Sequence, residues 1–332
     1  MYRLPAEWER QEYIMLTYPH ENSDWNCCLK EIKKSYKEII KAISKYEKCL
    51  IICNKISSAK SELSDIINDN ILFIEINTND TWIRDYGAID VFKKDEIISY
   101  DFTFNGWGNK FEAKLDNLVN NVLYKKRIFS NKLIKKEFIL EGGSIETNGK
   151  GVLLTTSKCL LNSNRNLLLS KNKIETKLKH FFGCKTIIWL ENGYLSGDDT
   201  DSHIDTLARF LNENTIAYVK CFDEKDEHFF ELNQMEKELE KTNFHLIPLP
   251  LPHPIYKDKK RLPATYLNFL FINGAILLPI YNDIYDKEVI TFFENFYTNI
   301  DIIPIDSTAL IREHGSIHCA TMHRFAKPKD IF

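Results

Sequence analysis

The sequence predicts an α/β fold in which one strand–strand–helix–strand unit occurs five times. Three observations lead to this prediction: polar residues recur at nearly even intervals, four segments have the pattern of a β-hairpin, and a helical and then a strand-like segment follow three of the hairpins. The recurring residues lie about 50 to 63 positions apart, which is typical of a structural repeat, and they are Asp90, Glu146, Asp205, Asn268 and His318. We expect a single domain over residues 1–332, a five-bladed α/β propeller around a central channel. The alternative is an open α/β sheet with inserted hairpins.

The N-terminal part of the chain predicts a β-α-β beginning. Residues 29–48 place apolar side chains on one helical face, among them Ile32, Tyr36 and Ile43. Residues 50–53 and 71–76 are apolar runs of strand length, and residues 58–68 between them have a helical pattern.

Four hairpins are predicted after this beginning. Two of them turn at Asn-Gly, which tolerates the positive φ of a type I′ turn, at Asn148-Gly149 and Asn273-Gly274. The paired strands are 88–92 with 97–104, 144–147 with 152–156, 207–211 with 215–219, and 266–272 with 275–280. Helices over 167–181, 234–241 and 285–297 follow the last three, each continued by a strand, over 186–190, 245–249 and 301–304. A closed ring of such units leaves few strand edges exposed.

The composition is that of a globular protein and excludes several classes. Of 332 residues, 44% are hydrophobic and 27% are charged, and the net charge is −3, so a basic face for nucleic acid is not expected. No apolar run approaches the roughly 20 residues of a membrane span, and the N-terminus lacks the apolar core of a signal peptide. The eight cysteines form no CxxC pair and no zinc-like spacing with histidine. Because free cysteines suit a reducing compartment, we expect a cytoplasmic protein without a metal or a membrane partner.

Three segments rich in aromatic or glycine residues carry candidate site residues. In residues 81–87, Trp82 and Asp85 offer a ring face and a charge, both of which attract cations; Arg84 and Asp85 could instead form a structural ion pair. In residues 140–143, two glycines follow Glu141, and they either form a bulge or let the backbone approach a ligand. Residues 104–110 place Trp107 either in a rim loop or on a packed turn.

A fourth segment, residues 198–205, contains an acidic run and a histidine. Asp198, Asp199 and Asp201 resemble a calcium loop, but the EF-hand spacing and its final glutamate are absent, so calcium is not expected. His203 and Asp205 are two positions apart, and in a strand both would point to the same face. This pattern predicts an acid/base pair at one site.

Cys319 lies in a polar setting near the C-terminal end, whereas a structural cysteine usually lies among apolar residues. A nucleophilic cysteine needs a cation or a base to offset its ordinary pKa of about 8.5. Carboxylates, one histidine and one reactive cysteine, without a metal or phosphate motif, indicate a planar cationic substrate. A guanidinium fits, because carboxylates bind its edges through paired hydrogen bonds and hold its carbon in front of the thiolate.

The sequence resembles the agmatine deiminases and the bacterial-type peptidylarginine deiminases over nearly its full length. The segments that carry the resemblance occur in order at residues 4–8, 18–20, 82–85, 104–108, 141–143, 198–201, 203–205 and 317–319. The resemblance implies the five-bladed propeller (pentein) fold, catalysis without a cofactor, and a homo-oligomer of two or more subunits.

The resemblance also implies roles for the candidate residues. Cys319 is the nucleophile and His203 the acid/base. Asp85 and Asp205 hold the guanidinium, and Glu141 orients His203 or the nearest guanidinium nitrogen.

The reaction that the resemblance implies converts agmatine to N-carbamoylputrescine and ammonia. The thiolate attacks the guanidinium carbon, and we expect the thiol to ionise only when the substrate cation arrives. His203 protonates the departing ammonia and then activates a water, which hydrolyses the S-alkylthiouronium intermediate. Trp82 lies against the flat cation, and Trp107 is a further substrate-binding candidate.

Two positions depart from the motifs of this family. Glu313-His314-Gly315-Ser316 replaces the usual Gly-Gly-Gly-Asn before Ile-His-Cys, and Ser202 replaces the glycine of Asp-Gly-His. Both changes bear on substrate identity more than on chemistry. The primary amine of agmatine is expected at the acidic run that begins at Asp198, or at Glu313. The alternatives are a protein-arginine deiminase, an amidinotransferase, and a guanidinium-binding module without catalysis.

Overall fold

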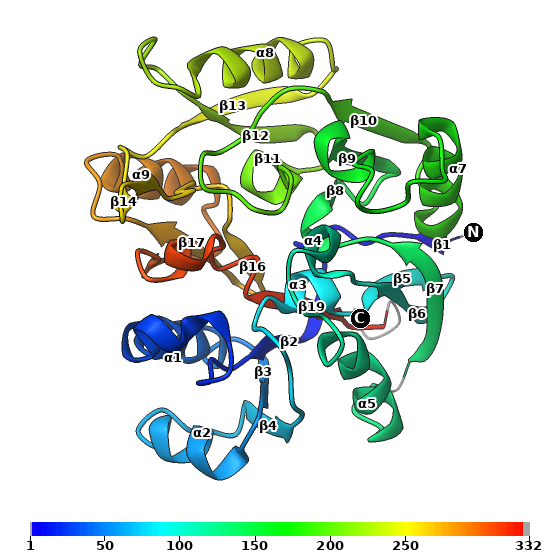
Figure 1. Ribbon diagram of the computed structural model, residues 1–332, viewed down its shortest axis with the longest axis vertical. Helices are drawn as coiled ribbons and strands as arrows, with labels where there is room; N and C mark the ends of the chain where they lie inside the picture. Colours follow the sequence, from blue (N-terminus) through cyan, green and yellow to red (C-terminus); the bar gives the residue numbers. More distant parts are fainter. Residues whose placement is uncertain (1, 130, 328–332) are drawn as a thin grey trace.

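The computed structural model describes residues 2–129 and 131–327, and it is a mixed α/β structure. Within these residues, five sheets share one arrangement, in which an antiparallel pair of strands is extended by a parallel strand. Figure 1 shows the sheets grouped around a central region that contains the short helix α3 (Ile83–Tyr86). A separate two-stranded sheet pairs β14 (Tyr256–Lys257) with β15 (Lys260–Arg261).

The strands of the five sheets are short. In sheet order they are β1 (Tyr2–Arg3), β5 (Ile89–Lys93), β6 (Glu96–Thr103) and β7 (Lys132–Ile139); β10 (Thr186–Leu190), β9 (Val152–Thr156) and β8 (Ile145–Thr147); β11 (Ala208–Asn212), β12 (Thr215–Lys220) and β13 (His245–Pro250); β16 (Leu270–Ile272), β17 (Ala275–Ile280) and β18 (Asp301–Asp306); and β19 (Thr321–Phe325), β2 (Gln11–Thr17), β3 (Lys48–Cys53) and β4 (Ile71–Glu75).

In each of the five sheets, a helix connects a strand of the antiparallel pair to the strand that pairs parallel with it, as is usual for a crossover between parallel strands. These helices are α1 (Leu29–Ile43), α5 (Val119–Lys125), α7 (Lys171–Phe182), α8 (Phe229–Leu239) and α9 (Asp286–Phe296). The apolar face of α1 that the sequence predicts is buried, since Ile32, Tyr36 and Ile43 are each 0% exposed. Within the described residues, the predicted order strand–strand–helix–strand is therefore present along the chain for four of the five sheets, whereas the fifth sheet takes the antiparallel partner of β2 from the C-terminal end, as β19.

Several predicted segments have different boundaries in the structure. The helices expected over 167–181 and 234–241, for example, are α7 and α8. The helix expected over 29–48 ends at Ile43, because Lys48 already begins β3. The helix expected over 58–68 is α2 (Ile56–Glu62). The strand expected over 266–272 begins only at Leu270, because the Thr265 hydroxyl accepts a hydrogen bond from the Leu267 N–H and makes a turn before it.

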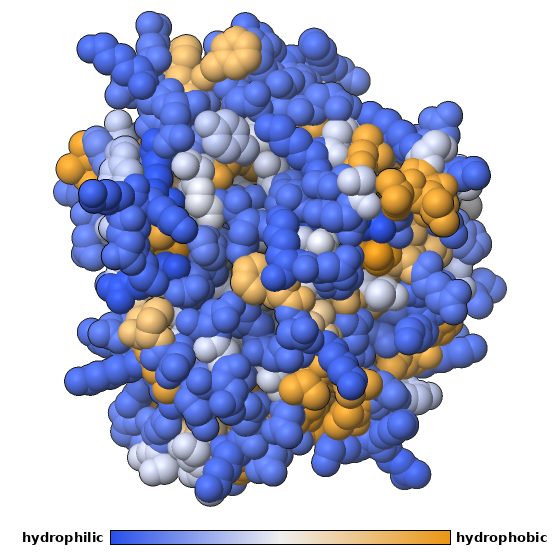
Figure 2. Space-filling model, viewed as in Figure 1, coloured by the Kyte–Doolittle hydropathy of each residue, from blue (hydrophilic) through white to orange (hydrophobic). Residues whose placement is uncertain are grey.

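One sheet joins the two ends of the chain, which the sequence analysis did not predict. Strand β2 pairs antiparallel with β19, with Ile14 opposite His323. Hydrophilic side chains cover most of the face shown in Figure 2, and the hydrophobic patches there are small and separate. None of the helices in the described part of the chain has the length and hydrophobicity of a transmembrane segment.

Candidate active site

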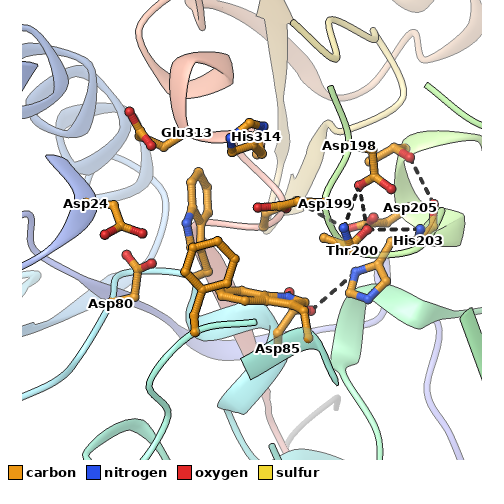
Figure 3. A pocket seen from close by; sticks show the side chains of 16 residues that line it. Asp24, Asp80, Asp85, Asp198, Asp199, Thr200, His203, Asp205, Glu313 and His314 are labelled. Carbon is orange, nitrogen blue, oxygen red and sulfur yellow. Dashed lines mark hydrogen bonds and ion pairs between the residues drawn. The ribbon is translucent and has the colours of Figure 1, made fainter. Parts of the chain in front are cut away.

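A cavity of about 540 Å³, counted with its open mouth, brings most of the predicted site residues together. Its walls come from the segment before α1, from α3 and its flanks, from the segment after β10 and from the segment before β19 (Figure 3). The predicted residues that line it are Trp82, Asp85, Trp107, Asp198, His203, Asp205, Glu313 and Cys319. Glu141 is the one predicted site residue that does not line it.

Cys319 is buried in the cavity wall, with its side chain beside Asp205. Its Sγ lies 3.6 Å from Asp205 Oδ2, and its backbone N–H donates to Asn268 Oδ1 at 3.2 Å. Burial, followed by the charges of Asp205 and Asp85, raises the pKa of the Cys319 thiol well above its usual value. The thiol is therefore protonated at neutral pH, and a cation between these groups would favour the thiolate.

Asp85, on α3, is held by two hydrogen bonds. The indole N–H of Trp107 donates to Oδ2 at 2.8 Å, and the backbone N–H of Gly143 donates to Oδ1 at 2.9 Å. Burial, followed by the charge of Asp205, raises the pKa of Asp85 well above its usual value. Two buried acids near one thiol thus form a site that favours a cation.

The two carboxylate oxygens of Asp205 have different surroundings. Oδ2 accepts a hydrogen bond from His318 Nδ1 at 2.7 Å, whereas Oδ1 is buried and has no hydrogen-bond partner among the described residues. Burial acts to raise the pKa of Asp205, but the hydrogen bond and charge of His318 outweigh it and hold that pKa below its usual value. Because a buried carboxylate oxygen rarely stays unpaired, Oδ1 is the natural acceptor for a substrate N–H.

His203 lies opposite Asp85 in the cavity (Figure 3), with its Nδ1 3.7 Å from Asp85 Oδ1. Its Nε2 is buried and has no hydrogen-bond partner among the described residues. Burial lowers the pKa of His203 to about 3, so the ring is neutral in the empty site.

The strand geometry predicted for His203 and Asp205 is wrong. Asp205 belongs to a 3₁₀ turn, Ile204–Thr206, and His203 comes directly before it. The chain turns because Asp201 and Ser202 have φ of 68° and 66°, the left-handed region that a glycine adopts without strain. This explains the position of the family's glycine, and it also brings His203 and Asp205 into one cavity without a strand.

Gly143 lets the backbone approach these groups closely. A Cβ on Gly143 would lie 2.7 Å from His203 Nδ1, 2.9 Å from Asp205 Oδ2 and 3.0 Å from Asp85 Oδ1. No other residue fits there without displacing one of the three side chains. The glycines after Glu141 therefore serve close approach to the site.

Glu141 lies behind the cavity wall and is fully buried. Both its oxygens accept hydrogen bonds from Arg165 Nε, at 2.9 and 3.0 Å, and Arg165 Nη1 also donates to Asp201 at 2.6 Å. One Glu141 oxygen, one His203 ring nitrogen and Cys159 Sγ lie within 4.8 Å of one another. Glu141 therefore lies near His203 but outside the lining of the cavity.

Asp198 stays a predicted partner of the substrate amine. It lines the cavity, but its oxygens accept hydrogen bonds from Thr200 Oγ1 at 2.5 Å and from the Ser202 N–H at 2.7 Å (Figure 3). The carboxylate of Asp198 is therefore engaged in shaping its own loop.

The two tryptophans form walls of the cavity. Gly315 packs on Trp82, since a Cβ on Gly315 would lie 2.4 Å from Trp82 Cζ3. Trp107 is only 5% exposed and adopts a φ of 53°, so it is a buried wall residue that fixes Asp85, not an exposed rim residue.

Several residues that line the cavity, above all acidic residues, were not among the predicted site residues. Asp80 and Asp24 lie across the cavity from His203 (Figure 3). Burial raises the pKa of Asp80 well above its usual value, and the charge of Asp24 adds to this effect. Asp80 adjoins the Thr81-Trp82 motif, which was its one signal in the sequence. Phe111 and Thr206 also line the cavity without having been predicted, whereas Asp199, Thr200, His314 and Gly315 belong to segments that the sequence had singled out.

The evenly spaced polar residues do not all reach this cavity. Asp205, Asn268 and His318 meet around Cys319. Glu146 instead pairs with Arg209 at 2.8 Å, and Asp90 pairs with Arg324 at 2.9 Å. Asp90 and Glu146 lie within strands β5 and β8, whereas Asp205, Asn268 and His318 lie in the segments before β11, β16 and β19, so the even spacing does not give these residues equivalent positions.

Among the residues that the structure describes, two groups bring potential metal ligands within 4.8 Å of one another: Glu141, Cys159 and His203, and Cys27, Cys28 and Glu313. A cationic side chain already neutralises the carboxylate of each group. Arg165 binds Glu141, and Lys257 Nζ lies 3.1 Å from Glu313 Oε1. Neither group therefore fits a resident metal.

The site as a whole is that of a cysteine-dependent enzyme acting on a planar cation. The chain belongs to the Porphyromonas-type peptidyl-arginine deiminase family, whose sequence profile matches residues 3–324. It is 50% identical to the agmatine deiminase of C. jejuni, solved as a cysteine-to-serine variant with substrate bound, with 98% of this chain and 97% of that one covered and a TM-score of 0.96.

More distant relatives extend this result. The agmatine deiminase of Pseudomonas aeruginosa is 28% identical over 99% of this chain and 96% of its own length. An amidinotransferase from Microseira wollei shares the fold alone, at 11% identity and a TM-score of 0.51, with 98% of this chain and 97% of that chain covered.

Proposed function

We propose that this protein is an agmatine deiminase, which hydrolyses agmatine to N-carbamoylputrescine and ammonia. The observation that carries the proposal is the position of Cys319 Sγ 3.6 Å from Asp205, in a cavity with acidic groups at both ends. Agmatine carries a guanidinium at one end and a primary amine at the other, so its two charges match the two acidic ends.

The guanidinium lies between Asp85 and Asp205 in this mechanism. The unpaired Asp205 Oδ1 accepts one of its N–H groups, and Asp85, fixed by Trp107 and Gly143, accepts others. The substrate charge offsets the two carboxylates and lowers the pKa of the Cys319 thiol from its raised value in the empty site. Binding and activation of the nucleophile are thus coupled.

Neutral His203 takes the proton of the thiol, and the Cys319 thiolate attacks the guanidinium carbon. The C–N bond to the terminal nitrogen then breaks, and His203 returns the proton to the departing ammonia. An S-alkylthiouronium remains on Cys319. Water, deprotonated by His203, attacks the same carbon, the C–S bond breaks, and the carbamoyl product leaves with the thiol restored. Glu141, near His203, orients the ring.

The opposite end of the cavity selects the substrate. We assign the amine of agmatine to Asp80 and Asp24, because both Asp198 oxygens are engaged in its own loop and Lys257 already binds Glu313. A cation there would restore the charge of Asp80, whose pKa burial has raised. The α-carboxylate of free arginine, or a peptide chain, would instead meet these acids, which supports agmatine over a peptidyl substrate.

The five sheets of common arrangement, grouped around α3, support a five-bladed α/β propeller with a central channel, in a single domain. We further propose a homo-oligomer in the cytoplasm, where the free cysteines of the described chain stay reduced. Light scattering of the purified protein tests the oligomer.

Ammonia release from agmatine, arginine and an arginine peptide tests the proposed function. We expect kcat/KM for agmatine to exceed the other two by at least about a hundredfold, because each mispaired charge costs several kcal/mol. Equal or faster release from the peptide would overturn it. The same assay with an added amine acceptor separates hydrolysis from amidino transfer, for which the product would carry the acceptor. Binding of agmatine without ammonia release would instead identify a guanidinium-binding module.

A further inference from the structure

His318, the residue before Cys319, lies between two carboxylates. Its Nδ1 is 2.7 Å from Asp205 Oδ2, and its Nε2 is 2.6 Å from Glu7 Oε1. The ring is 1% exposed and Asp205 is 0% exposed, so water does not mediate between these groups. Residues 7, 205 and 318 are thus joined in one chain of hydrogen bonds that ends beside the nucleophile.

The two contacts require two protons. A neutral imidazole carries one N–H, and a carboxylate only accepts unless it is itself protonated. With one proton, one of the two contacts would set a nitrogen lone pair against a carboxylate oxygen at hydrogen-bond distance, which is repulsive. From this count we infer that Glu7, His318 and Asp205 form a relay holding two protons, which positions Asp205 and reduces the negative charge that it presents to Cys319.

Two arginines and a second histidine surround the carboxylate of Glu7. Arg84 Nη1 lies 3.3 Å from Glu7 Oε1, Arg209 Nη2 donates to Oε2, and His323 Nδ1 lies 3.6 Å from Oε1. Burial acts to raise the pKa of Glu7, but its neighbours, Arg209 first among them, hold that pKa well below its usual value. Burial, followed by Arg209 and Arg84, also lowers the pKa of His318. The carboxylates of Glu7 and Asp205, on either side of the imidazole, therefore retain the second proton, either on the His318 ring or on a carboxylate oxygen.

The relay leaves Asp205 with one engaged oxygen and one free oxygen. Oδ2 stays hydrogen-bonded to His318 and lies 3.6 Å from Cys319 Sγ. Oδ1 remains available to the guanidinium. Glu7 and His318 touch neither substrate nor the reacting carbon, so both are positioning residues. This inference rests on the proposed function for its consequence in catalysis, but not for the proton count.

The variant Glu7→Gln tests the relay, and Glu146→Gln is its matched control. Both acids pair with Arg209, and the Glu7 side chain is 13% exposed whereas that of Glu146 is 3% exposed, but only Glu7 contacts His318. The glutamine amide donates to Nε2, so one proton leaves the relay and the charge of Asp205 faces the thiol uncompensated. We expect iodoacetamide to alkylate Cys319 about tenfold more slowly in substrate-free Glu7→Gln, the effect of one unit in thiol pKa. The Glu146→Gln rate should match that of the wild type.

We also expect kcat/KM for agmatine to fall roughly 10- to 100-fold in Glu7→Gln. Equal alkylation rates in all three proteins, or equal slowing in both variants, would overturn the relay. If Glu7→Gln does not fold, proton NMR of the wild type provides the test. We expect two low-field proton resonances that both vanish in His318→Gln. A single such resonance in the wild type would refute the count. Neither readout uses agmatine, so failure of the relay and failure of the proposed function are distinguishable.

Discussion

The indole N–H of Trp107 donates to Asp85 Oδ2 at 2.8 Å, from a tryptophan whose φ is 53°. This hydrogen bond fixes the rotamer of a buried carboxyl whose other oxygen accepts from the Gly143 N–H and lies 3.7 Å from His203 Nδ1. An unusual backbone conformation at Trp107 is thus coupled to the orientation of a group assigned to the guanidinium.

The variant Trp107→Phe keeps the aromatic wall and removes the donor. We expect kcat/KM for agmatine to fall roughly 10- to 100-fold, because a hydrogen bond to a charged group contributes about 1.5 to 3 kcal/mol. Steady-state kinetics measure the effect. Trp189→Phe is the control, since Trp189 donates to Glu175 at 2.9 Å but does not line the cavity. Equal losses in both variants would contradict the role of Trp107.

The variant Gly143→Ala places a methyl group among His203, Asp205 and Asp85, within 3.0 Å of each. We expect kcat to fall at least about a hundredfold, because small displacements of positioned groups cost that much. Gly151→Ala is the control: Gly151 has φ of 93°, so alanine strains the backbone there, but its Cβ meets only Lys185 at 3.7 Å. Gly151→Ala should lower thermal stability and leave kcat unchanged. Full activity in Gly143→Ala would refute the close approach.

The variant Asp80→Asn tests the amine end of the cavity. Asparagine still accepts the hydrogen bond that the Thr81 N–H donates to Asp80 Oδ1 at 2.7 Å, so only the charge is lost. We expect KM for agmatine to rise roughly 10- to 100-fold, while turnover of butylguanidine, which lacks the amine, changes little. Asp116→Asn, a nearby buried acid outside the cavity, should leave both substrates unaffected. A rise in KM that is the same for both substrates would contradict the assignment.

The raised pKa of Cys319 predicts selectivity among alkylating reagents. Because the thiol is neutral until a cation arrives, cationic chloroacetamidine should label Cys319 at least about tenfold faster than its neutral analogue chloroacetamide. Asp205→Asn removes a charge that raises the pKa, so labelling by the neutral reagent should become faster and the selectivity smaller. Peptide mass spectrometry measures both rates. A wild-type protein without selectivity would show that the thiolate is already formed.

Asp116 predicts a pH dependence of stability. Burial raises its pKa to about 7, and its Oδ2 has no partner within the described residues. A carboxyl with a raised folded pKa binds its proton more tightly in the folded state, so its contribution is complete below the unfolded pKa and is lost as pH rises through the folded value. Between about pH 4 and pH 7, the free energy of unfolding should therefore fall by up to about 1.4 kcal/mol per pH unit from this group.

Asp116→Asn should lack this slope. Its Oδ1 can still accept from the Asn79 and Asp80 N–H groups, as Asp116 Oδ1 does at 2.7 and 3.3 Å. Urea unfolding at several pH values gives the difference between variant and wild type. A difference that does not change with pH would contradict the titration of Asp116 in this range.

Sequence patterns predicted the strands that form local hairpins, because turn residues such as Asn148-Gly149 lie between them. They did not predict β2 paired with β19, since these strands lie at opposite ends of the chain and share no turn. The same distinction between local patterns and distant contacts applies to the site. Cys319, His203, Asp205 and Asp85 could be predicted because each belongs to a short motif of reactive and turn residues.

The residues that the sequence did not predict depend on distant packing. Asp24 reaches the cavity from the segment before α1, and Glu7 reaches His318 across 311 positions. Glu141 was predicted to orient His203 or a guanidinium nitrogen, but its partner Arg165, 24 positions away, was not predicted. A partner that far along the chain leaves no local pattern.

The most direct test of the central claim is the identity of the atom that carries the reaction intermediate. The wild-type protein is mixed with agmatine, quenched with acid during turnover, digested and analysed by mass spectrometry. We predict a covalent adduct on Cys319 with the mass of agmatine less ammonia, absent when Cys319→Ser replaces the wild type. Turnover of agmatine with no adduct on Cys319, or with an adduct on another residue, would contradict the account.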